Sequence, residues 1–233
     1  MPTDVPAAPT LVSPARRGLA GFRAGLAHHF DSSEQQREAA SLGVWVFLAT
    51  EVLFFGGLFA AYTVYRWLYP SVFAAGSHHL DVKLGAVNTA VLLTSSLTMA
   101  LAVRSAQTGR GKLSALLLFA TIVLGLVFLG IKYQEYHHKW VEHLVPGPTF
   151  HLAGVDRPMA QIFFCLYFGM TGLHALHMII GIALLLGLLA PAYLGWFGPR
   201  NYNFVEGMGL YWHFVDIVWI FLFPLLYLVG RHG

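Results

Sequence analysis

The sequence contains few charged residues: Asp, Glu, Lys and Arg make up 11% of its 233 residues, against roughly 25% in a soluble domain. This deficit argues against an ordinary soluble enzyme. The formal net charge is only +3, so the chain lacks the strongly basic field that nucleic-acid binding uses. Its single cysteine, Cys165, excludes a disulfide framework and any site built from several thiolates, and leaves the redox compartment open.

Hydrophobic residues, which make up 57% of the sequence, are gathered into long runs. A helix needs about 20 apolar residues to cross the ~30 Å hydrocarbon core of a bilayer. Five runs meet this requirement, at about residues 42–65, 84–103, 113–131, 159–190 and 207–229. Because lipid offers no hydrogen-bond partner to exposed backbone, each run is predicted to be helical. The predicted fold is an all-α integral membrane bundle of five transmembrane helices.

Residues 1–41 are predicted to form an N-terminal tail, partly disordered or interfacial, ahead of the bundle of residues 42–233. Apolar residues recur in the tail at helix-like intervals beside arginines, which favours either a short amphipathic surface helix or plain disorder. These residues are Leu19, Phe22, Leu26 and Phe30. The arginines also resemble those of a mitochondrial presequence, but Asp31, Glu34 and Glu38 make this the weaker interpretation.

The distribution of basic residues predicts the orientation, because short cytoplasmic loops are enriched in Lys and Arg. Arg104, Arg110 and Lys112 lie in a short connection without acids. The longer connection, residues 132–158, carries charges of both signs, and its first residues are predicted to continue the third helix into the interface. We therefore expect the N-terminus in the cytoplasm and the C-terminus outside.

Ionisable residues inside the predicted spans carry most of the functional information. A carboxylate at the centre of a membrane helix costs about 2.5 to 3.5 kcal/mol, and both Glu51 and Asp216 approach that depth. His174 and His177 are three residues apart and so share one helix face, and His213 and Asp216 repeat the spacing. These residues predict a polar layer between helices. The layer is either an interhelical hydrogen-bond network that holds the bundle together or a functional site.

A metal site in this layer is not predicted. Two haems held by one helix pair would need histidines several turns apart, whereas His174 and His177 are less than one turn apart. A metal ion held by these two residues and His213 fits the spacing, but Asp216 and the neighbouring aromatic residues explain the same pattern without metal. The histidines of the long connection are expected to be solvated; they are His137, His138, His143 and His151.

The remaining features indicate packing rather than catalysis. Glycines inside the spans predict close helix contacts, and they are Gly56, Gly57, Gly169, Gly172 and Gly181. The sequence shows no phosphate-binding loop, hydrolase nucleophile motif or ion-selectivity filter. It also shows no internal repeat, which disfavours a transporter built from inverted repeats.

Specific motifs do point to a family. The sequence resembles subunit III of the haem-copper respiratory oxidases, the cytochrome c oxidase subunit 3 family, in four motifs that occur in the family's order. The motifs are ATEVLFFGGLFAAY at 49–62, NTAVLLTSS at 88–96, TGLHALHMIIG at 171–181 and YWHFVDIVWIFL at 211–222. Glu135 and Tyr136, where the third span ends, match a further family motif. Longer members have seven spans, and this chain resembles the five-helix form.

The resemblance implies a subunit with no haem or copper of its own, docked on oxidase subunit I together with subunit II, other subunits and membrane lipids. Such a subunit stabilises subunit I, supports proton uptake, and is associated with phospholipid binding and oxygen access. Glu51 matches the family's buried carboxylate. The same resemblance implies interhelical polar contacts for five residues, His174, His177, Glu206, His213 and Asp216. It also implies aromatic residues at an interface, which are Tyr211, Trp212 and Trp219.

Several functions remain open. The glutamate in EVLFF favours subunit III of a cytochrome c oxidase in a bacterial inner membrane, ahead of a quinol oxidase or the mitochondrial inner membrane. A related accessory subunit of a nitric oxide reductase would share the same bundle. From another class, a proton-coupled transporter could use Glu51 as its proton carrier.

Overall fold

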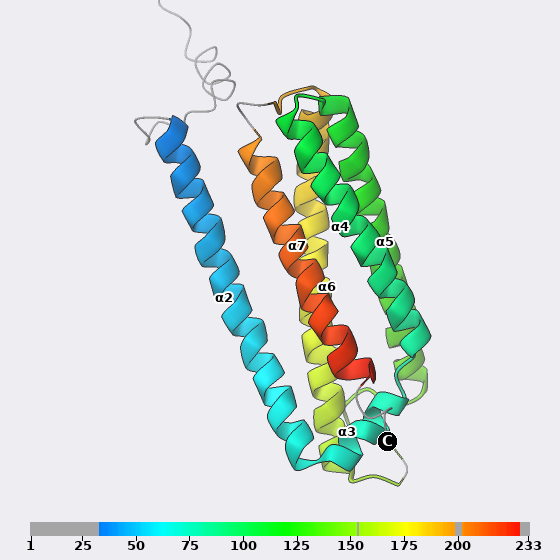
Figure 1. The fold of residues 1–233 in the computed structure, drawn as a ribbon. Helices are drawn as coiled ribbons and strands as arrows, with labels where there is room; N and C mark the ends of the chain where they lie inside the picture. The colour runs from blue at the N-terminus through cyan, green and yellow to red at the C-terminus, as the bar shows by residue number, and fades with distance from the viewer. Residues whose placement is uncertain (1–32, 153, 199–201, 229–233) are drawn as a thin grey trace, which may run out of the picture. The chain divides into compact units, whose positions relative to one another are not determined.

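The computed structural model describes residues 33–152, 154–198 and 202–228 (Figure 1). The chain divides into two compact units, residues 1–43 and residues 44–233. In the first unit, the described residues 33–43 are helical. The amphipathic tail segment considered above, at residues 19–30, lies outside the described residues.

The described residues form helices and contain no strand. The helices are α2 (Ser33–Leu68), α3 (Pro70–His78), α4 (Val82–Gln107), α5 (Gly111–Val141), α6 (Arg157–Tyr193), α7 (Asn203–Phe223) and the π-helical turn η1 (Pro224–Leu228). Five segments are long and apolar enough to cross a membrane: α2, α4, α5, α6 and α7 with η1. The prediction of an all-α membrane bundle with five spanning helices is confirmed.

The helices extend beyond the apolar runs that predict them. The 37 residues of α6 correspond to roughly 55 Å at 1.5 Å per residue, so this helix projects well past a ~30 Å hydrocarbon core. Helix α5 continues through Lys132 to Val141, as the sequence predicts. Helix α3 is not predicted, because nine residues are too few for a membrane span. Asp81 then starts α4, accepting hydrogen bonds at Oδ1 from the backbone N–H groups of Lys83 and Leu84.

Four helices pack closely against one another: α4 contacts α5 and α7, and α6 also contacts α5 and α7 (Figure 1). Two indole N–H groups of α7 bind hydroxyls of α4. Trp212 Nε1 lies 3.0 Å from Ser95 Oγ, and Trp219 Nε1 lies 3.1 Å from Thr89 Oγ1. Because the residue numbers on α4 rise as those on α7 fall, these bonds fix an antiparallel register.

Only part of the glycine prediction is correct. A Cβ atom at Gly181 would lie 3.0 Å from the Trp212 ring, so this glycine does permit a close contact. A Cβ at Gly56, Gly57 or Gly169 would meet nothing within 4 Å, because these three positions lie on exposed helix faces. At Gly172 the added atom would reach only the hydroxyl of Tyr136, at 3.8 Å.

Helix α2 joins the other helices through its side chains. Phe55 packs against Phe214, with ring centroids 6.2 Å apart, and the hydroxyl of Tyr62 donates to the carbonyl oxygen of Leu225 at 2.7 Å. The other faces of α2 remain apolar and open, since Leu53 is 77% exposed and Trp67 is 80% exposed. Such surfaces are expected where lipid or another subunit surrounds a helix.

Candidate functional site

The predicted buried acid has a histidine partner on another helix. Nε2 of His177 on α6 lies 3.2 Å from Oε2 of Glu51 on α2, and the two side chains are 13% and 19% exposed. The ring of Phe55 packs edge-on against the His177 ring, with the ring centroids 5.4 Å apart. From α7, Tyr211 donates its hydroxyl proton to the backbone carbonyl of His177 at 2.9 Å. Residues of three helices therefore fix this pair.

The hydrogen bonds of His177 determine how many protons the pair carries. Nδ1 lies 2.8 Å from the carbonyl oxygen of Leu173, which can only accept, so Nδ1 carries a hydrogen. The contact between Nε2 and Glu51 then needs one further proton. If that proton is on Glu51, both groups are neutral; if it is on Nε2, an imidazolium faces a carboxylate. In either state the pair has zero net charge, which suits a membrane interior.

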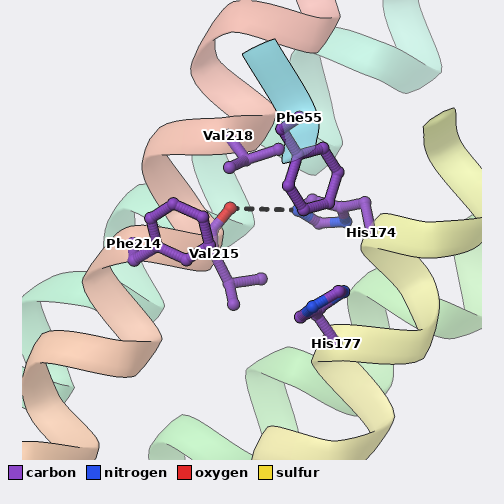
Figure 2. Close-up of a pocket in the computed structure, with 6 residues that line it drawn as sticks. All are labelled: Phe55, His174, His177, Phe214, Val215 and Val218. Carbon is purple, nitrogen blue, oxygen red and sulfur yellow. Dashed lines mark hydrogen bonds between the residues drawn. The ribbon is translucent and has the colours of Figure 1, made fainter. Parts of the chain in front are cut away.

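His174 lies one turn away and makes a different contact. Its Nε2 donates to the carbonyl oxygen of Val215 at 3.1 Å, while its buried Nδ1 has no hydrogen-bond partner among the described residues. Figure 2 shows His174 and His177 on one side of a small pocket that is closed by apolar side chains of α2 and α7. The space between these side chains is too tight for a water molecule. Its other lining residues are Phe55, Phe214, Val215 and Val218.

His213 faces α4 instead of the His177 pair. Its Nδ1 lies 2.8 Å from Oγ of Ser96, and both residues are partly exposed. Asp216 is 3% exposed, and neither of its carboxyl oxygens makes a hydrogen bond within the described part of the chain. Ser96 on α4 is a polar neighbour of this carboxyl, and its hydroxyl also pairs with Nδ1 of His213. The residues predicted as one polar layer thus make separate contacts in the structure.

The other residues of the matched motifs lie elsewhere. Glu206 is exposed in the first turn of α7, and its side chain has no hydrogen bond or ion pair within residues 33–152, 154–198 and 202–228. Trp212 and Trp219 are fully buried between helices, where they bind Ser95 and Thr89. Tyr136 and Thr171 are hydrogen-bonded to each other through their hydroxyls, joining α5 to α6.

Lys132, which the sequence does not single out, forms a buried ion pair with Glu135. Lys132 Nζ lies 2.8 Å from Glu135 Oε2, and the two side chains are 4% and 3% exposed. Nζ also donates to the hydroxyls of Tyr167 at 3.2 Å and Tyr227 at 3.0 Å. The three-residue spacing of Lys132 and Glu135 within a predicted helix was a usable signal for the pair. Tyr167 and Tyr227 lie far from Lys132 in the sequence, so no sequence pattern links them to it.

No metal centre is evident in the described ranges. Within residues 33–152, 154–198 and 202–228, no three His, Cys, Asp or Glu side chains gather so as to hold a metal ion. The four histidines at the end of α5 and after it, at positions 137, 138, 143 and 151, are all exposed. The chemistry that the described polar groups support is proton binding and interhelical hydrogen bonding.

Comparison with known proteins identifies the family. The model of the family described as cytochrome c oxidase subunit III matches residues 27–231. The chain belongs to this family. It is an integral membrane protein, and as a family member it is a subunit III of the haem-copper respiratory oxidases.

Three relatives show the range of the family. Cytochrome bo(3) ubiquinol oxidase subunit 3 of Pseudomonas aeruginosa is 30% identical over 203 residues, covering 87% of this chain and 91% of the relative. Cytochrome c oxidase subunit 3 of Alkalihalophilus pseudofirmus is 30% identical over 212 residues, covering 90% and 96%. Heme-copper oxidase subunit I+III of Aeropyrum pernix is 33% identical over 192 residues, covering 80% of this chain and 22% of that longer relative.

Proposed function

We propose that this chain is the non-catalytic third subunit of a cytochrome c oxidase, docked on a subunit I in which oxygen is reduced to water. The relative from Aeropyrum pernix supports a partnership with subunit I, because its name joins subunits I and III in one chain. Haem and copper are held by the partner subunits, with subunit II among them. The glutamate of EVLFF favours the cytochrome c type.

A quinol oxidase is the second candidate, and the relatives support it as well as they support the first. The relative from Pseudomonas aeruginosa, whose name specifies ubiquinol, is as identical to this chain as the cytochrome c oxidase relative from Alkalihalophilus pseudofirmus. The donor can be tested by purifying the tagged chain in mild detergent with its partners. We expect haem absorption bands and oxygen consumption with reduced cytochrome c. Oxygen consumption with quinol alone would identify the second candidate, and a colourless chain without partners would refute both.

The role of the chain in this complex is to stabilise subunit I and to support its proton uptake. The observation that carries this role is the contact between Nε2 of His177 and Oε2 of Glu51, which are 3.2 Å apart. Both side chains are partly exposed. The pair holds one proton in either of two neutral arrangements, so it can pass a proton between carboxylate and imidazole without creating net charge in the membrane. We place it next to subunit I, where it would favour rapid proton supply.

The test is oxidase that carries Glu51→Gln, assayed for turnover, proton uptake and inactivation during turnover. We expect slower proton uptake and faster inactivation, because glutamine cannot exchange a proton with His177. The matched control is Glu206→Gln, the same substitution at an exposed acid whose side chain has no hydrogen bond within the described ranges. If both variants behaved like wild type, the role assigned to Glu51 would be rejected.

The membrane arrangement follows from the same proposal. The bundle lies in the plasma membrane of a bacterium, with the N-terminus in the cytoplasm and the C-terminus outside. The acid-free connection that carries Arg104, Arg110 and Lys112 supports this orientation. Residues 1–41 act as the interfacial tail of the bundle, and phospholipid covers the apolar faces that subunit I leaves open.

A further inference from the structure

The ammonium group of Lys132 is saturated by polar contacts. A lysine side chain has three N–H donors, and Nζ of Lys132 has three acceptors: Glu135 Oε2, Tyr167 Oη and Tyr227 Oη. The carboxylate of Glu135 is engaged at both oxygens, because Tyr227 donates to Oε1 at 2.6 Å. Lys132 and Glu135 are each 3% exposed, so water does not supply these contacts.

Aromatic rings surround the same ammonium group. Nζ lies 5.2 Å from the ring centroid of Tyr136, 5.1 Å from Tyr167, 5.3 Å from Trp219 and 5.7 Å from Tyr227. All four distances are within the roughly 6 Å at which an aromatic ring attracts a cation. An ordinary ion pair needs only the carboxylate. Several aromatic rings around one cation are the arrangement that proteins use to bind ammonium ligands, and here Glu135 adds a carboxylate to it.

We infer that Glu135 and the four surrounding aromatic residues form an ammonium-binding cage, which the chain fills with its own Lys132 to hold the C-terminal turn η1 against α5 and α6. Tyr227 is the residue of η1 that enters the cage, and it is fully buried. The rings come from α5, α6, α7 and η1, so one cation binds together segments that are separate in the sequence. This inference does not depend on the proposed oxidase function.

The ligand class of the cage can be tested by removing its natural occupant. Lys132→Ala deletes a fragment equivalent to n-propylamine, so the full-length purified variant is titrated with n-propylammonium chloride while its thermal unfolding is followed. We expect a lower Tm than wild type and a saturable recovery of several degrees with propylammonium. The neutral isostere 1-propanol should give no such recovery, because it cannot replace the charge opposite Glu135.

A matched control is available on the same helix. Lys139 and Glu142 form an ion pair with the same spacing, 2.7 Å between Nζ and Oε2, but Glu142 is 45% exposed and no cation–π contact to Lys139 is found in the described residues. Propylammonium should therefore not raise the Tm of Lys139→Ala. Equal recovery of both variants, or equal recovery with propanol and propylammonium, would overturn the cage.

A second comparison covers the case in which Lys132→Ala does not fold. Lys132→Met and Glu135→Gln each leave one charge buried without its partner, whereas the double variant leaves none. We expect each single variant to give a lower Tm, or less folded protein in the membrane, than the double variant. If Lys132→Met alone matched wild type in both measurements, the ammonium group would have no role and the inference would be wrong.

Discussion

Trp212 of α7 donates its indole N–H to the Ser95 hydroxyl of α4 at 3.0 Å, while Gly181 of α6 lies against the same ring. A Cβ atom at Gly181 would be 3.0 Å from the Trp212 ring and 3.1 Å from the Tyr211 ring. The indole cannot retreat from an added side chain without stretching its bond to Ser95. The hydrogen bond and the glycine therefore act together to set the spacing between α6 and α7.

Gly181→Val should lower the stability of the bundle by about 1 to 3 kcal/mol, the usual cost of overpacking. The measurement is thermal or denaturant unfolding of the purified chain. Gly187→Val is the control on the same helix, since a Cβ at Gly187 meets nothing within 4 Å and both substitutions carry the same propensity cost. Equal loss of stability in the two variants would contradict the close contact.

The sequence was sufficient to predict the membrane helices because lipid imposes a simple length rule on apolar runs. It was also sufficient to identify Glu51 and His177 as polar residues inside the spans, and both are partly buried in the structure. It could not pair them, because they are 126 positions apart and the periodicity of α2 or α6 alone does not say which helix lies opposite. Asp216 was expected to join the same layer, yet it lies on the face of α7 that packs toward α4.

Lys132 illustrates a different limit. Its charge favoured a place beyond the end of the third span, and the apolar run does stop at Ile131. Within the folded chain, the free-energy cost of burying the Lys132 charge is offset by Glu135, one helical turn away, and by tyrosines of α6 and η1. A rule that scores each residue against lipid cannot detect compensation by side chains that only the tertiary fold brings together.

The hydroxyl of Tyr62 anchors α2 to the end of the bundle through the carbonyl oxygen of Leu225. Tyr62→Phe removes this bond with little change in packing, so we expect a loss of about 0.5 to 1.5 kcal/mol in unfolding free energy. Tyr133→Phe is the control, because Tyr133 is 75% exposed. A variant of Tyr62 that unfolded at the wild-type temperature would show that the carbonyl finds another donor.

The contact between Glu51 and His177 should appear as an energetic coupling. In a double-mutant cycle with Glu51→Ala and His177→Ala, we expect a coupling of about 0.6 kcal/mol and at most about 1.7 kcal/mol, the average and the maximum measured for side-chain hydrogen bonds in a membrane bundle. Unfolding in detergent of the two single variants and the double variant measures it. As a control, Thr63→Ala on the exposed face of α2 should add to His177→Ala without coupling. Additive effects at Glu51 as well would argue against a stable pair.

The orientation can be tested with cysteines in a Cys165→Ala background. Thr108 and His151 are both exposed and lie in connections at opposite ends of the spanning helices. With the N-terminus in the cytoplasm, a membrane-impermeant thiol reagent applied to whole cells should label His151→Cys and spare Thr108→Cys. After the membranes are broken, both should react. The reverse pattern on whole cells would place the N-terminus outside.

Asp216 is a buried acid that we expect to lower the stability of the isolated bundle rather than raise it. Its two carboxyl oxygens lack hydrogen bonds within the described residues, and a buried polar group without a partner costs about 1 to 3 kcal/mol. Asp216→Leu, which has a similar size, should therefore raise the Tm of the isolated bundle. His174→Leu should lower it, because that substitution removes the bond from Nε2 to the carbonyl of Val215.

The comparison separates two explanations for an acid in this motif. If Asp216 mainly holds helices together, Asp216→Leu must destabilise the isolated chain as His174→Leu does. If the acid is instead unsatisfied in the folded chain, the isolated bundle gains stability, and the haem copurified per chain measures whether assembly with the catalytic subunit depends on it. We expect the second result, because neither carboxyl oxygen makes a hydrogen bond within the described residues and the side chain is only 3% exposed, so that water does not satisfy it either.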